Sequence, residues 1–268
     1  MVSTSRSKQL VQLVALTTGL LWFSWTEAAT VLVTGANRGI GLEFSKQYAA
    51  KGWKVIATHR RPENPATLKA LSAKYPASVV IERLDVQDHA MIEDLAKKFE
   101  GEPIDLLINN AGIFGSLTNR QEQMFGTLDH TLFDSFMHTN VLGPIKISEA
   151  FLENIKASDR KQIVIVSATA GSFALNSRNP YPGGYFYKAS KAALNIAFVS
   201  LAKDTKRFGI TVTILSPGQV KVEKLADHTI PGQISPEESI SGMIRVIESQ
   251  MPTASGRFFD YKGKSRQW

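Results

Sequence analysis

The chain has 268 residues, of which 43% are hydrophobic and 21% charged, and these proportions are typical of a soluble globular protein. It contains no cysteine, which excludes disulfide bonds, thiolate metal sites and cysteine nucleophiles. The net charge of +7 comes from lysines and arginines that are scattered along the chain instead of gathered in blocks, so nucleic acid is not an expected partner.

The N-terminal segment, residues 1–29, differs from the rest of the chain. Arg6 and Lys8 precede an uncharged, largely apolar run over residues 9–25, which is typical of a targeting or anchoring segment. Cleavage at its end would leave the first strand at a bare terminus. We therefore expect an uncleaved anchor at an endomembrane such as the endoplasmic reticulum, with a plastid or mitochondrial transit segment as the alternative. Residues 30–268 alternate strands and helices without a linker and predict one domain.

The first expected strand, Thr30–Val33, leads directly into the sequence TGANRGIG, Thr34 to Gly41, and then into a helical pattern. Gly35 lets the chain turn tightly, while Gly39 and Gly41 keep side chains away from a ligand at the helix N-terminus. This arrangement is typical of a dinucleotide site with the pyrophosphate against the turn. A tight turn without a ligand is the alternative interpretation.

The second expected strand, Val55–Thr58, is followed at once by His59, Arg60 and Arg61. In a dinucleotide fold this position lies beside the adenosine ribose, where an acid binds the 2′-hydroxyl and a base binds a 2′-phosphate. No acid is present, and the arginines, together with Arg38 in the glycine turn, can pair with phosphate. The sequence therefore favours NADP over NAD, with a solvated loop as the alternative reading of these residues.

The next two expected strands end in residues that would face the same crevice. Asp85 follows the strand Val79–Leu84 and either accepts a hydrogen bond from the adenine amino group or caps the next helix. The strand Ile104–Ile108 runs into Asn-Asn-Ala-Gly at residues 109–112. Two amides followed by two small residues suit a crevice in which backbone packs against a flat cofactor.

Two long helices are expected in the second half of the chain. The first covers Thr131–Phe151 and has Asn140, a poor helix former, near its middle. The second follows a proline- and glycine-rich loop and covers Tyr185–Phe208. Tyr187 and Lys191 are four residues apart, which places both side chains on one face of this helix.

The C-terminal part predicts the end of the sheet and a lid. A strand is expected at Thr211–Leu215, followed by the irregular, polar stretch Gln219–Gln233, which is long enough to be a substrate lid. Ser-Pro-Glu-Glu at residues 235–238 is a capping box, so a helix is expected from there to about Gln250. Arg257–Tyr261 then predicts the last strand.

Three ordered motifs together resemble the short-chain dehydrogenases/reductases: TGANRGIG, Asn-Asn-Ala-Gly at 109–112, and Tyr-Lys-Ala-Ser-Lys at 187–191. The resemblance covers Thr30 to Trp268, and the final residues are similar to those of the smaller C-factor- and sniffer-like carbonyl reductases. It implies a single Rossmann-type α/β fold, a doubly wound parallel sheet of about seven strands with helices on both faces. It also implies a homodimer or homotetramer, and NADPH-dependent hydride transfer between the nicotinamide and a ketone or aldehyde, or an alcohol in reverse.

The resemblance also implies a role for each site residue. Tyr187 acts as acid and base, Lys191 lowers the pKa of that phenol and holds the nicotinamide ribose, and Asn140 kinks its helix and holds a water. Cofactor contacts are expected from Gly35, Asn37, Arg38, Gly39, Ile40, Gly41, Arg60, Asp85, Val86, Asn110, Ala111, Gly112, Tyr187, Lys191, Pro217, Gly218 and Val220, and no metal site is expected.

Two positions depart from the family's pattern. The serine that orients the substrate carbonyl is replaced by Ala168, and Ser167 would point to the opposite face of the strand, which leaves Thr169 and Ser172 as candidates. Val222 stands where the family commonly has a threonine that contacts the carboxamide. Together these departures are compatible with weak activity, with a restricted substrate, or with the alternative function of an NADP-binding regulatory or scaffold protein with weak or no turnover.

Overall fold

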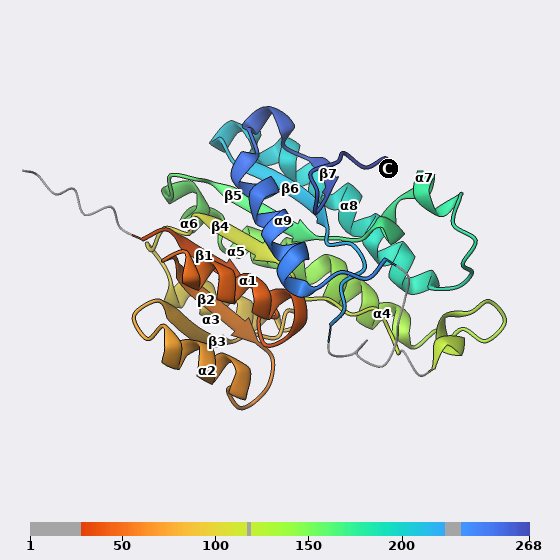
Figure 1. Ribbon diagram of the computed structural model, residues 1–268, viewed down its shortest axis with the longest axis horizontal. Coiled ribbons are helices and arrows are strands. Elements are labelled where there is room, and N and C mark those ends of the chain that lie inside the picture. Colours follow the sequence, from red (N-terminus) through yellow and green to blue (C-terminus); the bar gives the residue numbers. More distant parts are fainter. Residues whose placement is uncertain (1–27, 117–118, 223–231) are drawn as a thin grey trace, which may run out of the picture.

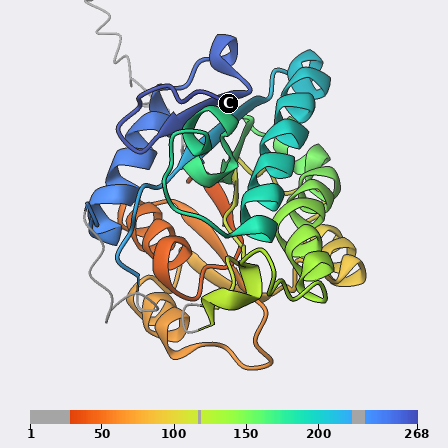
Figure 2. The same cartoon turned by 90° about the vertical axis from the view of Figure 1, so that its right-hand side faces the viewer.

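The computed structural model describes residues 28–116, 119–222 and 232–268. Seven strands form one parallel sheet in the order β3-β2-β1-β4-β5-β6-β7, with helices on both faces (Figure 1, Figure 2). The strands are β1 Thr30–Val33, β2 Lys54–His59, β3 Val79–Arg83, β4 Leu106–Asn109, β5 Gln162–Val166, β6 Thr211–Ser216 and β7 Arg257–Asp260. The predicted Rossmann-type α/β fold is confirmed.

The helices divide between the two faces of the sheet. They are α1 Gly39–Ala50, α2 Ala66–Lys74, α3 His89–Lys98, α4 Leu132–Met137, α5 Gly143–Ala150, α6 Leu152–Ala157, α7 Phe173–Asn176, α8 Tyr185–Thr205 and α9 Pro236–Ser249. Side chains of α1, α2 and α9 pack into one apolar cluster, and those of α3, α5, α6 and α8 pack into the other.

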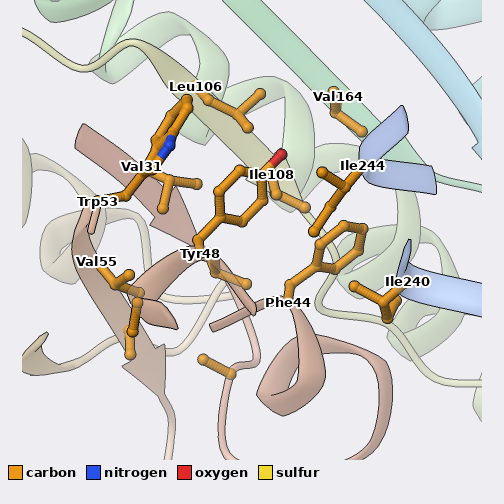
Figure 3. Close-up of a cluster of buried hydrophobic side chains, with 14 of the residues drawn as sticks. Val31, Phe44, Tyr48, Trp53, Val55, Leu106, Ile108, Val164, Ile240 and Ile244 are labelled. Carbon is orange, nitrogen blue, oxygen red and sulfur yellow. The ribbon is translucent and has the colours of Figure 1, made fainter. Parts of the chain in front are cut away.

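Each central strand contributes to both clusters because successive side chains of a strand point to opposite faces. In β1, Val31 belongs to the cluster under α1 and α9, whereas Leu32 belongs to the cluster under α8. Figure 3 shows the first cluster, in which Phe44 and Tyr48 of α1 gather with Ile108 of the sheet and Ile244 of α9. Burying one such side chain stabilises the fold by about 1.5–3 kcal/mol. Because helices cover both faces of the sheet, the sequences of the central strands are nearly continuous apolar runs.

The order of the strands creates a crevice between β1 and β4. The chain moves outward from β1 through β2 to β3, and then crosses back to place β4 on the other side of β1. The loops that follow β1 and β4 therefore lead away from one another at the carboxyl ends of their strands. Ligands of doubly wound sheets bind at this switch point.

The predicted helix over Thr131–Phe151 is interrupted, which corrects the sequence analysis. Between α4 and α5 lies a π-helical turn, His138–Leu142, which contains Asn140. A π turn inserts one extra residue per turn and is frequent at functional sites. The kink expected at this asparagine therefore takes the form of a widened turn.

Hydrogen bonds at the N-termini of α9 and α3 confirm one predicted helix cap and contradict another. The Ser235 hydroxyl accepts from the N–H of Glu238 at 3.1 Å, so the predicted cap of α9 is confirmed. Asp85 does not cap α3: the cap is Asp88, whose carboxylate accepts from the N–H of Met91 at 3.1 Å. Asp85 instead accepts from the N–H of Gln87 within the loop.

Two predicted segments fall mainly outside the described residues. These are the N-terminal anchor, of which only residues 28 and 29 are described, and the lid, of which residues 223–231 are not. Among the residues that are described, no helix has the length and apolar character needed to cross a bilayer. The anchor, its membrane and the oligomeric state stay predictions.

Lys161 provides a test of backbone strain at the start of β5. Its φ of 51° lies in the left-handed region that L-residues avoid, while its N–H donates to the Ser158 hydroxyl at 3.2 Å. Replacement by glycine keeps this bond and removes the strain, so Lys161→Gly should raise the free energy of unfolding by about 0.5–1 kcal/mol in urea titrations. The matched control is Lys203→Gly in the last turn of α8, where the same change should lower stability.

Candidate functional site

A cleft of about 510 Å³ opens at the carboxyl ends of β1, β2, β3 and β4. It brings together residues that the sequence predicted as cofactor contacts: Gly35, Asn37, Arg38, Gly39, Ile40, Gly41, Arg60, Asp85, Val86, Asn110, Ala111 and Gly112. The four strand ends deliver these residues from segments that are far apart in the chain, so the strand order creates the site.

Hydrogen bonds join the loop after β1 to the loop after β4. The Thr34 hydroxyl accepts from the N–H groups of Asn110 and Ala111 at 2.9 and 3.0 Å. In return, the side-chain amide of Asn110 donates to the carbonyl oxygens of Thr34 and Gly35 at 2.9 and 3.2 Å. The glycine turn after β1 and the Asn-Asn-Ala-Gly motif after β4 therefore form one wall of the cleft.

The glycines of the first turn are required by this wall. Gly35 has a φ of 66°, and a Cβ there would lie 3.0 Å from the Cα of Ala111. A Cβ on Gly41 would overlap the carbonyl oxygen of Gly35 and the amide nitrogen of Asn110. Gly41 lines the cleft, but its missing side chain makes room for the protein's own backbone, a reason that the sequence analysis did not find.

The end of the cleft beside β2 carries positive charge. Arg38 and Arg60 are both exposed, line the cleft and form no ion pair with another described residue. The first turn of α1 holds no acidic residue, so the positive end of its dipole is not neutralised. Arg61 differs from its neighbour because it lines an adjacent groove with Pro62 and Pro65.

Lys191 and Tyr187 of α8 approach the cleft from its other end. Lys191 is buried and its ammonium donates to the Val166 carbonyl oxygen at 2.9 Å. The Tyr187 ring packs edge-on against Phe114, with the ring centroids 6.2 Å apart. A Cβ on Gly112 would lie 3.7 Å from the Lys191 nitrogen, which places this amine directly behind the cleft wall.

Burial governs the proton affinities of both groups. It lowers the pKa of Lys191 to about 8 and raises the pKa of Tyr187 to about 12. The expected lowering of the tyrosine pKa by Lys191 is not found, because burial alone accounts for the shift. At neutral pH the phenol of Tyr187 is therefore protonated, which is the state that a proton donor requires, and the amine of Lys191 is mostly charged.

Asn140 links the loop after β4 to α8. Its side-chain oxygen accepts from the N–H of Ile113 at 2.8 Å. Its amide nitrogen donates to the Ile113 carbonyl oxygen at 2.8 Å and to the Ser190 hydroxyl at 2.9 Å. The side-chain amide is thus committed to protein partners, and a water held by this residue stays a prediction.

The hydroxyls near Ala168 are not equivalent. The Ser167 hydroxyl donates to the side-chain oxygen of Asn195 at 2.6 Å and so has a structural partner. The fully buried Ser172 caps α7 and donates to the carbonyl oxygen of Gln267 at 2.7 Å, so its hydroxyl has structural partners. Thr169 is half-buried, and its hydroxyl bonds to no described residue, which makes it the better candidate of the predicted pair.

Several residues differ in placement from the sequence predictions. Tyr187, Lys191, Pro217, Gly218 and Val220 do not line the cleft, whereas Val222 does. The sequence analysis missed Leu84, Ile113, Phe114, Gly115, Ser116, Glu122, Leu132, Phe136 and Thr139, which also line it. Most of these lie on the loop after β4 or on the helix leading to Asn140, where adjacency to two recognised motifs was the available signal.

Comparison with known proteins gives a consistent family. The model described as short chain dehydrogenase matches residues 29–230. The chain is 35% identical over 167 residues to C-signal of Myxococcus xanthus, covering 62% of this chain and 93% of that protein. Its fold is similar to the NADPH-bound carbonyl reductase from chicken fatty liver, with a TM-score of 0.80 and 31% identity. It is also similar to the carbonyl reductase Sniffer of D. melanogaster, with a TM-score of 0.77 and 25% identity. Both similarities cover 90% of this chain and 100% of the other.

Because its charge is buried, we expect Lys191 to lower the stability of the fold. The folded-state pKa of about 8 is below the ordinary lysine pKa of 10.5, so folding must desolvate a charge at neutral pH. Lys191→Met should therefore raise the free energy of unfolding at pH 7 by about 1–3 kcal/mol, after the lost hydrogen bond to Val166 is allowed for. The penalty is fully present below about pH 8 and disappears as the pH rises through 10.5.

Urea titrations of both proteins at several pH values measure this difference. An unchanged or lowered stability of Lys191→Met at pH 7 would show that the ammonium is well solvated or paired in the fold. A gain that persisted unchanged above pH 10.5 would show that it has another cause than the buried charge.

Proposed function

The chain belongs to the short-chain dehydrogenase/reductase family, and from that premise we propose that it reduces apolar ketones or aldehydes with NADPH. It is an NADP-dependent oxidoreductase of the carbonyl reductase type. The observation that carries the proposal is the placement of two α8 side chains, Lys191 beside Gly112 and Tyr187 against Phe114, at one end of a cleft that also carries Arg38 and Arg60.

The residues of the cleft fit NADP(H). The N-terminus of α1 and the glycine turn would bind the pyrophosphate, and Arg38 and Arg60 would bind the 2′-phosphate. The wall formed by Ala111 and Gly112 would pack against the flat part of the cofactor. When bound, NADPH supplies the hydride, and the protein provides orientation and charge.

The protein's own part of the reaction is proton transfer. The Tyr187 hydroxyl donates a proton to the carbonyl oxygen as negative charge develops on that oxygen. The Lys191 ammonium favours the phenolate that remains, because an opposite charge nearby stabilises the ionised form. Thr169 would orient the carbonyl in place of the serine that Ala168 replaces.

The cleft lining supports an apolar substrate. Phe114, Leu132, Phe136 and Val222 line it, and Phe114 also packs against the ring of Tyr187. An apolar or aromatic group attached to the carbonyl would lie against these side chains and exclude water from the reacting atoms. The carboxylate of Glu122, which also lines the cleft, accepts from the N–H of Ser116 at 2.7 Å and so shapes the loop.

A second candidate function is NADP binding with weak or no turnover, in a regulatory or scaffold role. It is favoured by Ala168 together with the structural partners of Ser167 and Ser172, which leave Thr169 to orient a carbonyl. Turnover that rises several-fold in Ala168→Ser would identify the missing hydroxyl and favour this reading of the native chain.

The two neighbouring arginines provide a matched test of cofactor choice. Arg60 lines the cleft and Arg61 lines the adjacent groove, so Arg60→Ala should weaken NADPH binding about tenfold or more and leave NADH binding nearly unchanged. Arg61→Ala is the control and should change neither. Calorimetric titration with both cofactors measures the effect, and equal losses in the two variants would contradict the assignment.

The proposed reaction is tested with Tyr187→Phe. Wild-type protein should consume NADPH in the presence of apolar ketones or aldehydes, whereas the variant should lose turnover by about 100-fold or more because the proton donor is gone. Calorimetry should show unchanged NADPH binding, because Tyr187 does not line the cofactor cleft. Full turnover in the variant would rule out this residue as the acid.

A further inference from the structure

Helix α8 begins without a capping side chain of its own. Its N-cap is Gly184, which has a φ of 70° and no side chain to accept a hydrogen bond. The N–H of Lys188, which donates to the Gly184 carbonyl oxygen at 2.8 Å, makes the first bond of the helix. The N–H groups before it, including that of Tyr187, need acceptors from elsewhere.

Gln123, from a distant part of the chain, supplies two such acceptors. It ends the 3₁₀ turn Arg120–Gln123 in the loop after β4, and its exposed fraction is 7%. Its side-chain oxygen accepts from the N–H of Tyr187 at 3.1 Å, and its main-chain oxygen accepts from the N–H of Gly184 at 2.9 Å. One buried residue therefore caps the helix that carries the proposed acid.

The same side chain also holds the wall of the cleft. Its amide nitrogen donates to the carbonyl oxygen of Phe114 at 3.0 Å, and the Phe114 ring packs against the Tyr187 ring. Both polar ends of the Gln123 side chain are thus satisfied. A shift of this amide would move the substrate wall and the backbone of the proton donor together.

The surrounding backbone is shaped to receive Gln123. Gly115 has a φ of 94°, and a Cβ there would overlap the Gln123 amide nitrogen. Gly183 has a φ of 79°, and a Cβ there would overlap the sulfur of Met124. Side chains at these two positions would displace the turn that carries Gln123, so the close approach depends on both glycines.

We infer that Gln123 is a positioning residue for the carbonyl reduction proposed above: it holds Tyr187 and Phe114 in register across the reacting site. The inference rests on the proposed function for its catalytic consequence. The hydroxyl of Tyr187 lies at the far end of a long side chain, so a small tilt at the start of α8 displaces it. Misplacement of a reacting group by about 1 Å costs on the order of 100-fold in rate.

The first experiment replaces the amide by an apolar group of similar size. Gln123→Leu should lower kcat per folded, NADPH-binding molecule by about 10- to 100-fold and change the affinity for NADPH little, because the residues proposed to bind the phosphates, Arg38, Arg60 and the glycine turn, are not among its hydrogen-bond partners. The matched control is Gln121→Leu in the same turn, where the side chain is exposed, and it should retain full kcat. An unchanged kcat in Gln123→Leu would overturn the inference.

A conservative variant separates the two hydrogen bonds. Gln123→Glu keeps an acceptor for the Tyr187 N–H but cannot donate to the Phe114 carbonyl oxygen, so it should retain the helix cap and recover only part of the kcat lost in Gln123→Leu. Equal losses in both variants, with reduced thermal stability, would assign Gln123 a structural role and overturn the positioning role.

Amide hydrogen exchange provides a readout that does not require turnover. The N–H of Tyr187 should exchange faster in Gln123→Leu than in the wild type, and should be protected again in Gln123→Glu. Failure of the wild-type protein to reduce any carbonyl would refute the proposed function, while the exchange data would still decide whether Gln123 caps α8. Unchanged exchange in Gln123→Leu would overturn the inference.

Discussion

The hydrogen bonds between Thr34 and Asn110 are the constraint on which the rest of the site depends. They join residues 76 positions apart, at the point where the strand order reverses between β1 and β4. Two loops that leave neighbouring strands in different directions would otherwise move apart. Because Gly35 and Gly41 lack side chains, the backbones approach closely enough for these bonds to form, and the cleft wall becomes a fixed surface.

At the end of the cleft beside α8, burial disfavours the charged forms of Lys191 and Tyr187. The Lys191 ammonium is buried and donates to the Val166 carbonyl oxygen, and its pKa is lowered because desolvation disfavours its charged form. Burial likewise keeps the phenol of Tyr187 protonated. The fold therefore buries an unfavourable positive charge at the end of the cleft where the proposed reaction would develop a negative oxygen, and it keeps the proposed proton donor neutral.

Of the hydroxyls near Ala168, those of Ser167 and Ser172 bind structural partners, and Thr169 is left as the candidate for the proposed reaction. Ser172 ties the loop after β5 to the last residues of the chain, and the N–H of Ala174 donates to the Trp268 carbonyl oxygen at 2.9 Å beside it. Trp268 stacks on Phe258 of β7, with the ring centroids 5.5 Å apart. The C-terminal residues, which pack on β7, thus support the segment after β5 that carries Thr169.

The sequence by itself determined the fold class, the glycine turn, the cleft residues at the strand ends and the pair Tyr187 and Lys191. These depend on local patterns, since the periodicity of strands and helices fixes which side chains share a face. Tertiary structure decided which of two adjacent arginines lines the cleft, which hydroxyl near Ala168 has no structural partner, and which residue caps α8. Each of these depends on contacts between segments that are distant in sequence, 64 positions apart for Gln123 and Tyr187, and on the direction in which a loop points its side chains. A pattern within one segment carries no information about such directions, because they are set by the packing of the segments against one another.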